Sequence, residues 1–240
     1  MSIYINYGKL NFMKKTYISF FIGNCCILSA CSPTQSENDK LNSSLSSSTN
    51  TSSYATIAND IENQEVFRNN LQKCPASSSP VIQTLFPSTS DSTTNACEDN
   101  QSKCYQLCLK NDAVACYFSA LSLQEANYKL PAEQLFQRSC ELGVASGCTN
   151  RAAGMLNFTK HLTAEQKKCI FSTFEKTCDW RDPWGCTMFA DQLISEENTE
   201  PNYKKALNAL NYSCKYGEDD PACQSAKELQ KFINSKLKQK

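Results

Sequence analysis

The stretch Leu135–Met155, which reads LFQRSCELGVASGCTNRAAGM, decides the fold of this chain. Two cysteines, Cys140 and Cys148, stand eight positions apart, and Gly143 lies between them. Glycine ends many helices because it adopts the left-handed backbone conformation without strain. Apolar residues flank the cysteines at offsets that place them on one face of a helix. The stretch therefore predicts the end of one helix, a tight corner and the start of the next helix.

The same pattern occurs four times between Cys108 and Cys223. The other cysteine pairs are Cys108/Cys116, Cys178/Cys186 and Cys214/Cys223. The first cysteines of successive pairs are 32, 38 and 36 residues apart, and a period of this length is typical of stacked helix pairs. A bridge within each pair would fasten one corner and contribute roughly 2–3 kcal/mol in the loop-entropy model. We expect an all-α fold: a disulfide-stapled solenoid of helix pairs, wound as a right-handed superhelix.

Residues around the cysteines keep the same register. The positions four before each first cysteine hold Cys104, Phe136, Phe174 and Leu210. Those four after the second cysteine hold Ala120, Ala152 and Ala190, with Ala226 displaced by one. Those three after the first cysteine hold Asn111, Gly143, Arg181 and Gly217. Asp182-Pro183 and Asp220-Pro221 are typical of a capping acid followed by a proline in the first helical turn.

The N-terminus has the features of an export signal. Lys14 and Lys15 precede Thr16–Ala30, an apolar core of signal-peptide length that is too short for a comfortable membrane span. Met13 is the better start, because residues 1–12 add nothing that a signal needs.

The end of this segment, Leu28-Ser29-Ala30-Cys31, resembles the bacterial lipobox. The resemblance implies that residues 1–30 are removed and that Cys31 carries lipid and anchors the chain in a membrane. Ser32 after the cysteine favours the outer membrane, if the host is Gram-negative. An ordinary signal peptide with a nearby Ala-x-Ala-like cut is the alternative, and it also implies export.

Export decides how the cysteines are interpreted. In an oxidising compartment a high cysteine count indicates a disulfide framework. Of the 15 cysteines, Cys25 and Cys26 leave with the signal and Cys31 carries lipid, so 12 remain and complete pairing is possible. The cysteines outside the regular pairs are Cys74, Cys97, Cys104 and Cys169.

These four cysteines allow three connectivities, and the sequence does not choose among them. Cys104 and Cys108 share a helical face, so we do not expect them to bond each other. Pairing of Cys74 or Cys97 with Cys104 is one candidate. Zinc binding by these thiols is the alternative to pairing.

The remaining sequence divides by composition. Residues 31–55 are rich in Ser, Thr and Asn and predict a flexible tether. Residues 56–96 are poorly defined, with a weak helical pattern over 56–73 in which Ile57, Ile61, Val66 and Leu71 are the apolar positions. Residues 97–240 hold the repeats and end in a capping helix that starts near Cys223.

The repeats resemble the Sel-one-like family, relatives of the tetratricopeptide repeats, and in particular its secreted, cysteine-rich Hcp-type branch. The likeness is carried by Leu135–Gly143 with Gly147-Cys148, and by Asn202–Leu207 leading to Cys214. It covers about residues 100–240. The chain departs from the family because the connections at 124–130, 157–163 and 196–201 contain no glycine. The corner at 178–186 also carries two tryptophans where small residues are usual.

The resemblance implies a helical array that binds a protein or peptide. The chain has 24 basic and 24 acidic residues, and this balance argues against a dedicated nucleic-acid binder. Arg181 and Trp184 are the candidate binding residues, since arginine and aromatic side chains are frequent anchors of interfaces. We expect Trp180 to pack between adjacent units, because it occupies the register position of Leu142 and Tyr216.

Proteins resembling the Hcp-type branch are often labelled beta-lactamases, which makes a hydrolase the alternative function. A serine beta-lactamase needs Ser-x-x-Lys together with Ser-Asp-Asn and Lys-Thr-Gly elements. The only Ser-x-x-Lys here is Ser235–Lys238, and the other two elements are missing. The single histidine, His161, cannot supply the ligand cluster of a zinc hydrolase. We therefore expect no catalytic residues, no cofactor and no metal, and a surface position for His161.

Overall fold

The chain folds into helices wherever its structure is described. A computed structural model describes residues 53–78, 93, 96–97, 100–195 and 201–239, and the regular elements in these ranges are α-helices. The all-α prediction is thus confirmed. The signal peptide, Cys31 and residues 32–52 of the predicted tether lie outside the described residues. Residues 53–55, assigned to the tether, instead begin a helix that runs to residue 63.

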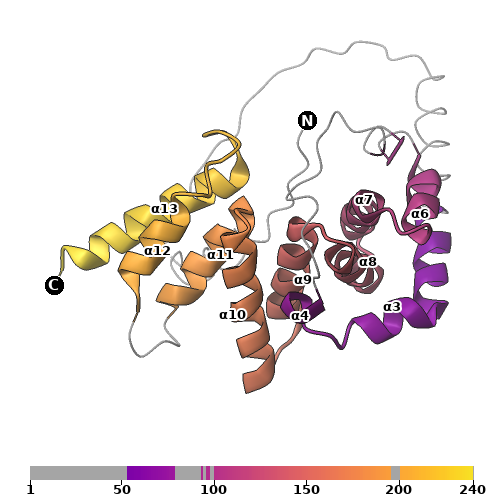
Figure 1. Cartoon of the computed structure of the whole chain (residues 1–240), viewed down its shortest axis with the longest axis horizontal. Coiled ribbons are helices and arrows are strands. Elements are labelled where there is room, and N and C mark those ends of the chain that lie inside the picture. Colours follow the sequence, from indigo (N-terminus) through magenta and orange to yellow (C-terminus); the bar gives the residue numbers. More distant parts are fainter. Residues whose placement is uncertain (1–52, 79–92, 94–95, 98–99, 196–200, 240) are drawn as a thin grey trace, which may run out of the picture.

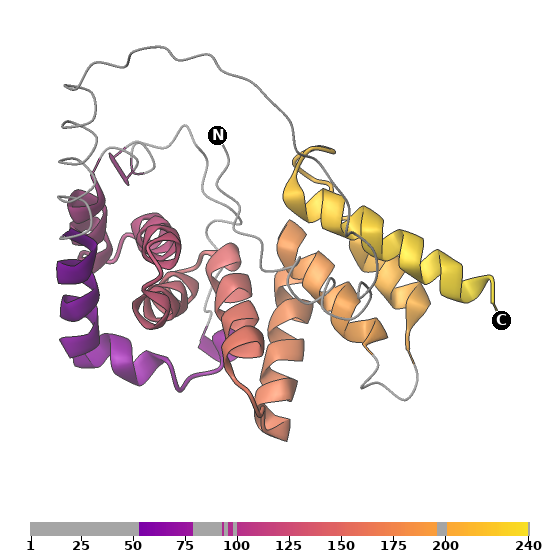
Figure 2. The same ribbon diagram turned by 180° about the vertical axis from the view of Figure 1, so that it is seen from behind.

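The repeat region contains four helix pairs in chain order. Their bounds are Gln101–Leu109 (α6) with Ala113–Glu125 (α7), Lys129–Glu141 (α8) with Ala145–Phe158 (α9), Ala164–Asp179 (α10) with Pro183–Ile194 (α11), and Tyr203–Leu210 (α12) with Pro221–Leu237 (α13). Each helix contacts the next, so the pairs form one array from α6 to α13 (Figures 1 and 2). This is the repeat-like arrangement that the cysteine spacing predicts, while its right-handed winding stays a prediction.

Side chains at the helix starts explain where the second helix of a pair begins. Asp112, Asp182 and Asp220 stand directly before α7, α11 and α13, and each carboxylate accepts a hydrogen bond from a backbone N–H of the first turn. Such caps satisfy donors that have no partner inside the helix. Pro183 and Pro221 occupy the first helical positions, where the missing N–H costs nothing.

The helix ends at the corners adopt the predicted left-handed conformation. The φ angles are 68° at Asn111, 101° at Gly143, 67° at Arg181 and 108° at Gly217. The same conformation occurs at Asn127, with φ of 67°, in the connection between α7 and α8. Asparagine tolerates this conformation better than most residues. It therefore turns the chain in a connection where the resembled family uses glycine.

The apolar core consists of two clusters. One joins the helix at 53–63 to α6, α7 and α8, and the other joins α9 to the helices from α10 to α13. Between them, α8 and α9 bury a set of polar side chains: Glu133, Gln134, Gln137, Ser139, Ser146, Thr149 and Arg151. Buried polar groups need partners to avoid a desolvation penalty. Polar contacts as well as apolar ones therefore join the two halves of the array.

The region before the repeats packs onto them. In the helix at 53–63, Ile57 and Ile61 are buried in the first cluster, and Asp60 accepts a 2.6 Å hydrogen bond from the Tyr105 hydroxyl on α6. Glu65–Asn70 (α3) and Pro75–Ser78 (α4) follow. The apolar pattern was misleading at Val66, which is 49 % exposed. The helix at 53–63 therefore covers the α6 end of the array.

Candidate interaction site

Residues 65–78, here called the strap, lie across α8, α9 and α10. Figures 1 and 2 both place α4 beside α9 and α10, and α3 lies against α8. The strap is held largely through its main chain. Arg151 on α9 donates to the Leu71 carbonyl at 3.2 Å, and Lys176 on α10 donates to the Ala76 carbonyl at 2.9 Å. The Ala76 N–H donates to the Thr173 hydroxyl at 3.2 Å. This part of the array thus already binds a peptide segment.

Side chains also hold the strap at Phe67 and over residues 70–74. On α8, Glu141 accepts a hydrogen bond from the Asn70 amide and pairs with Lys73 at 3.3 Å. On α10, Cys169 forms a disulfide with Cys74, and the two cysteines are 95 residues apart in sequence. Phe67, only 2 % exposed, anchors the strap in the first apolar cluster.

The other bridges are short. The structure joins Cys108 to Cys116, Cys140 to Cys148, Cys178 to Cys186 and Cys214 to Cys223, the pairs expected from the spacing. It also joins Cys97 to Cys104, one of the candidate pairings, whereas Cys74 does not pair with Cys104. With these bonds formed, the twelve cysteines are not zinc ligands. Among the described residues, no cluster of His, Cys, Asp and Glu could hold a metal ion.

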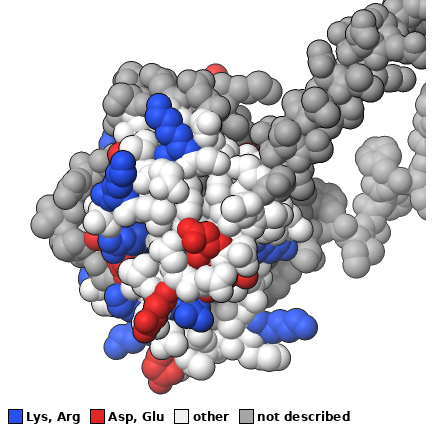
Figure 3. Space-filling view, turned by 90° about the vertical axis from the view of Figure 1, so that its right-hand side faces the viewer, with Lys and Arg blue, Asp and Glu red and all other residues white. Residues whose placement is uncertain are grey.

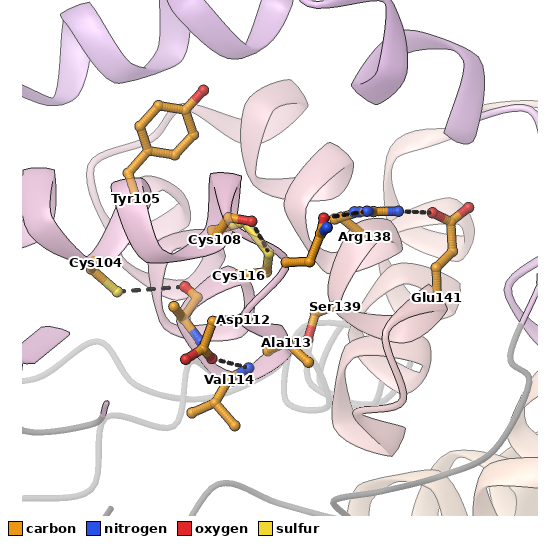
Figure 4. The surroundings of a disulfide bond; sticks show 12 residues. Cys104, Tyr105, Cys108, Asp112, Ala113, Val114, Cys116, Arg138, Ser139 and Glu141 are labelled. Carbon is orange, nitrogen blue, oxygen red and sulfur yellow. Dashed lines mark hydrogen bonds and ion pairs between the residues drawn. A yellow bond between two sulfur atoms is a disulfide. The ribbon is translucent and has the colours of Figure 1, made fainter. Parts of the chain in front are cut away.

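The corner of Cys108 and Cys116 is tied to the next unit as well as to itself. At the corner of Cys108 and Cys116, Asp112 accepts from the backbone N–H groups of Val114 and Ala115, each at 3.0 Å (Figure 4). The Ser139 hydroxyl on α8 donates to the Ala113 carbonyl at 2.8 Å, and Arg138 bridges Glu141 to the Asn111 side chain. Hydrogen bonds therefore fix this corner against α8.

The strongest such tie lies at Asp182. Its carboxylate accepts from Ser146 at 2.8 Å and from Thr149 at 2.6 Å, both on α9, and from the Gly185 N–H at 2.9 Å. Burial raises the pKa of Asp182, and these three hydrogen bonds and Lys215 nearby oppose the rise. Asp182 therefore links the second helix pair to the third through a buried carboxyl group.

A second buried carboxyl group lies under the strap. Glu133 on α8 and Arg151 on α9 form an ion pair of 2.9 Å. Burial raises the pKa of Glu133 to about 7, although Arg151 acts in the opposite direction. A side chain at Gly154 would collide with the Glu133 carboxylate, so this glycine makes room for it. Because Arg151 also binds the Leu71 carbonyl, the ion pair supports the strap.

The predicted binding residues lie at the corner between α10 and α11. Arg181 is exposed, and its guanidinium carbon stacks 3.5 Å from the centre of the Tyr212 ring. Trp184, in the first turn of α11, is half-buried, as is Trp180. Cation–aromatic stacking of this kind holds the side chains of Arg181 and Tyr212 in place.

Sequence reasoning missed the two tyrosines of this surface. Tyr212 and Tyr216 are 42 % and 46 % exposed. The Tyr216 pKa is raised by partial burial, then by the nearby charges of Asp182 and Asp220. The sequence did contain a signal for Tyr216, because this residue shares its register position with Trp180. Arg181, Tyr212, Lys215 and Tyr216 are here called the corner patch.

The register positions of the strap-binding residues recur one unit further along, where they hold different residues. Counting back from Cys178 and Cys214, the α10 positions Cys169, Thr173 and Lys176 correspond to Lys205, Ala209 and Tyr212. Counting forward from Cys148 and Cys186, Arg151 corresponds to Phe189. The Lys205 ammonium lies 4.9 Å from the centre of the Phe189 ring and pairs with Glu175 at 2.8 Å. This face of α10, α11 and α12, here called the second face, is less polar than the face under the strap.

The motifs considered for catalysis lie elsewhere. Ser235 is exposed on α13, and its hydroxyl donates to the Phe232 carbonyl at 2.7 Å. His161 is exposed in the connection between α9 and α10.

At the α6 end of the array, acidic and basic side chains are interspersed among uncharged ones (Figure 3). Within the part of the chain that the structure describes, no helix is long and apolar enough to cross a membrane.

Comparisons of the chain with protein-family models, curated proteins and solved structures give no match.

Proposed function

We propose that the protein is a membrane-anchored, extracytoplasmic protein-interaction module of the Sel-one-like, Hcp type, which binds an extended segment of a partner protein. The observation that carries this proposal is the strap. Arg151, Thr173 and Lys176 bind a peptide main chain between successive helix pairs. On the second face, one unit further along, Lys205 and Tyr212 are exposed at the corresponding positions, and Phe189 and Ala209 are buried beneath them. Tyr212 also belongs to the corner patch.

The chemistry of the second face favours a partner different from the strap. Ala209 replaces the hydroxyl of Thr173, and Phe189 and Tyr212 replace two cationic side chains. Aromatic rings at a protein interface are the usual anchors for apolar side chains, and arginine adds a directed polar contact. We expect the partner segment to place an apolar side chain against Tyr212 and a hydrogen-bond acceptor against Arg181.

The disulfide framework supports an extracytoplasmic location. Six bridges join the described cysteines, and such frameworks persist in oxidising compartments. The lipobox-like sequence ending at Cys31 supports a lipid anchor in the cell envelope, and Ser32 supports the outer membrane of a Gram-negative host.

The partner site is tested by site-specific photo-crosslinking in native membranes. A photoreactive residue in place of Tyr212 is expected to capture one discrete protein, whereas the same residue in place of Glu228 on α13 is not. With the captured protein purified, an Arg181→Ala/Tyr212→Ala variant is expected to bind it at least about 30-fold more weakly, because two anchors are removed. Equal capture at both positions, or unchanged affinity of the variant, would place the partner elsewhere on the array.

The anchor is tested by a Cys31→Ala variant. A single cysteine carries the lipid in this proposal, so its loss is expected to move the protein from the membrane fraction to the soluble extracytoplasmic fraction. Fractionation and the mass of the N-terminal peptide measure both effects. A Cys25→Ala variant is the control, since Cys25 leaves with the signal. Membrane retention of the Cys31→Ala protein would show that the anchor is not this lipid.

A further inference from the structure

We propose that the Cys74–Cys169 disulfide is a redox-modifiable latch: a dithiol reductant opens this bridge first and thereby releases the strap from α8, α9 and α10, while the rest of the array stays folded. This inference does not depend on the partner site proposed above. It rests on the access of a reductant to each bridge and on how the strap is held.

The disulfides that the described residues form differ in how exposed they are to a reductant. Cys74 and Cys169 are both part-exposed. In every other bridge at least one cysteine has no exposed surface: Cys104, Cys116, Cys140, Cys148, Cys186 and Cys223. Cys214 is part-exposed like Cys74, but its partner Cys223 is buried. Thiol–disulfide exchange requires a thiolate to approach a sulfur in line with the bond, so exposed bridges react first.

The location of the latch makes its opening local. The other five bridges join residues seven to nine positions apart and fasten individual corners or the start of α6. Only the bridge at Cys74 joins segments 95 residues apart, and one of these segments is the strap. Reduction of this bridge therefore leaves every corner of the array intact.

Without its bridge the strap keeps one buried apolar anchor, Phe67, and a small set of polar contacts. These are the hydrogen bonds of Ala76 with Thr173 and Lys176, of Leu71 with Arg151 and of Asn70 with Glu141, and the Lys73–Glu141 ion pair, in which Lys73 is half exposed. The net contribution of each such hydrogen bond to stability is small, and that of an exposed ion pair is smaller still. Segments that are held mainly by contacts of this kind open locally without global unfolding.

The exchange proceeds in two steps. A thiolate of the reductant attacks one sulfur of the bridge, forms a mixed disulfide with it and displaces the other cysteine as a thiolate, which takes up a proton. The second thiol of the reductant then attacks the mixed disulfide and displaces the remaining cysteine as a thiolate, which also takes up a proton. The reductant leaves as its intramolecular disulfide. Two electrons and two protons pass to Cys74 and Cys169, which become thiols.

Opening of the latch uncovers groups that bind a main chain. Thr173, fully buried in the closed form, and the donors of Arg151 and Lys176 lose their partners in the strap. In the closed form Arg151 and Lys176 bind the carbonyls of Leu71 and Ala76, and Thr173 binds the Ala76 N–H. A synthetic peptide of residues 65–78 with Cys74→Ser is therefore a suitable probe for the uncovered face.

The test combines differential alkylation with hydrogen exchange on the purified full-length protein. During titration with dithiothreitol, we expect Cys74 and Cys169 to become alkylated at a reductant concentration at least about tenfold lower than Cys214 and Cys223. At that concentration, amide exchange over 65–78 should rise at least about tenfold and that of α11 should stay unchanged. The fluorescent strap peptide should bind only to the reduced protein, and unlabelled peptide should displace it.

Two variants separate the latch from general destabilisation. A Cys74→Ser/Cys169→Ser variant should show fast exchange over 65–78 without reductant, and a Cys97→Ser/Cys104→Ser variant should not. Alkylation of all cysteines at one reductant concentration would overturn the inference, as would a strap that stays protected once Cys74 and Cys169 are alkylated. Peptide binding that is equal before and after reduction would show that the strap does not cover the binding groups.

Discussion

An Asp182→Ala variant is expected to lose about 3 kcal/mol of unfolding free energy, because the buried carboxylate is at once a helix cap and a link between helix pairs. Removing it leaves the hydroxyls of Ser146 and Thr149 and the Gly185 N–H without their acceptor in a buried site. Loss of the cap alone typically costs about 1 kcal/mol. The two stranded hydroxyls account for the rest, each at roughly 1 kcal/mol.

The chain offers a matched control in Asp220. Both Asp182 and Asp220 cap a helix and precede a proline at the first helical position. Asp220, however, accepts its cap hydrogen bond from the Ala222 N–H, and among the described residues it has no serine or threonine partner on a preceding helix pair. An Asp220→Ala variant should therefore lose only about 1 kcal/mol.

Urea unfolding followed by far-UV circular dichroism, with disulfides intact, measures both losses. An Asp182→Asn variant, which keeps the size of the side chain, should fall between the wild type and Asp182→Ala. If Asp182→Ala and Asp220→Ala lose the same free energy, Asp182 acts as a cap alone and the link between helix pairs contributes nothing.

The repeating features of this fold were predictable from the sequence because each is local. The eight-residue spacing of Cys140 and Cys148 fixes a corner whatever the rest of the chain does, and the left-handed positions follow from Gly143 and its register partners. Arg181 shows the strength of the register. A residue with no intrinsic preference for positive φ adopts it there because the corner requires it.

The strap was not predictable for the opposite reason. Its sequence carries no repeat, and its path depends on contacts with helices up to 100 residues away, such as that of Ala76 with Lys176. The pairing of Cys74 with Cys169 depends on the same path. From the sequence alone, the three ways of pairing the four cysteines outside the regular pairs cannot be told apart. The docking of the strap on α10 distinguishes them, because it brings Cys74 to Cys169.

The polar centre of the array was missed because polar residues on an amphipathic helix are normally assigned to the solvent face. Glu133 and Gln137 stand four positions apart on α8, a spacing that suits a solvated stripe equally well. They are buried because α9 and the strap cover this face of the helix. A helical pattern identifies which residues share a face, but not what packs against it.

An Arg151→Met variant should lose about 3–5 kcal/mol of unfolding free energy at pH 8, because it leaves the Glu133 carboxylate buried without a cation. Methionine preserves much of the length and apolar volume of the side chain. The loss should shrink as the pH falls, since a protonated Glu133 is neutral and needs no partner. Arg151→Met should also loosen the strap, because the Leu71 carbonyl loses its donor.

The pH dependence of the wild type follows from the Glu133 pKa, raised from 4.5 to about 7 in the folded protein. Between these values the folded state binds more protons than the unfolded state, so stability falls as the pH rises. The unfolding free energy that the protonated Glu133 carboxyl group contributes is fully present below pH 4.5 and is lost once the pH passes 7. The change amounts to about 3 kcal/mol. In Arg151→Met the pKa should rise further, and the fall should continue above pH 7.

A Glu133→Gln/Arg151→Met double variant distinguishes the buried charge from the packing. Replacing both partners of a buried ion pair by neutral residues is often close to neutral for stability, so the double variant should recover most of the free energy that Arg151→Met loses at pH 8. Its stability should also depend less on pH between 5 and 8 than that of the wild type, because Glu133 no longer titrates and of the two buried carboxyl groups only Asp182 remains. If Arg151→Met and the double variant are equally unstable at pH 8, the loss comes from the packing of Arg151 and its bond to the strap. Glu133 would then not be the group that makes the stability of this array depend on pH.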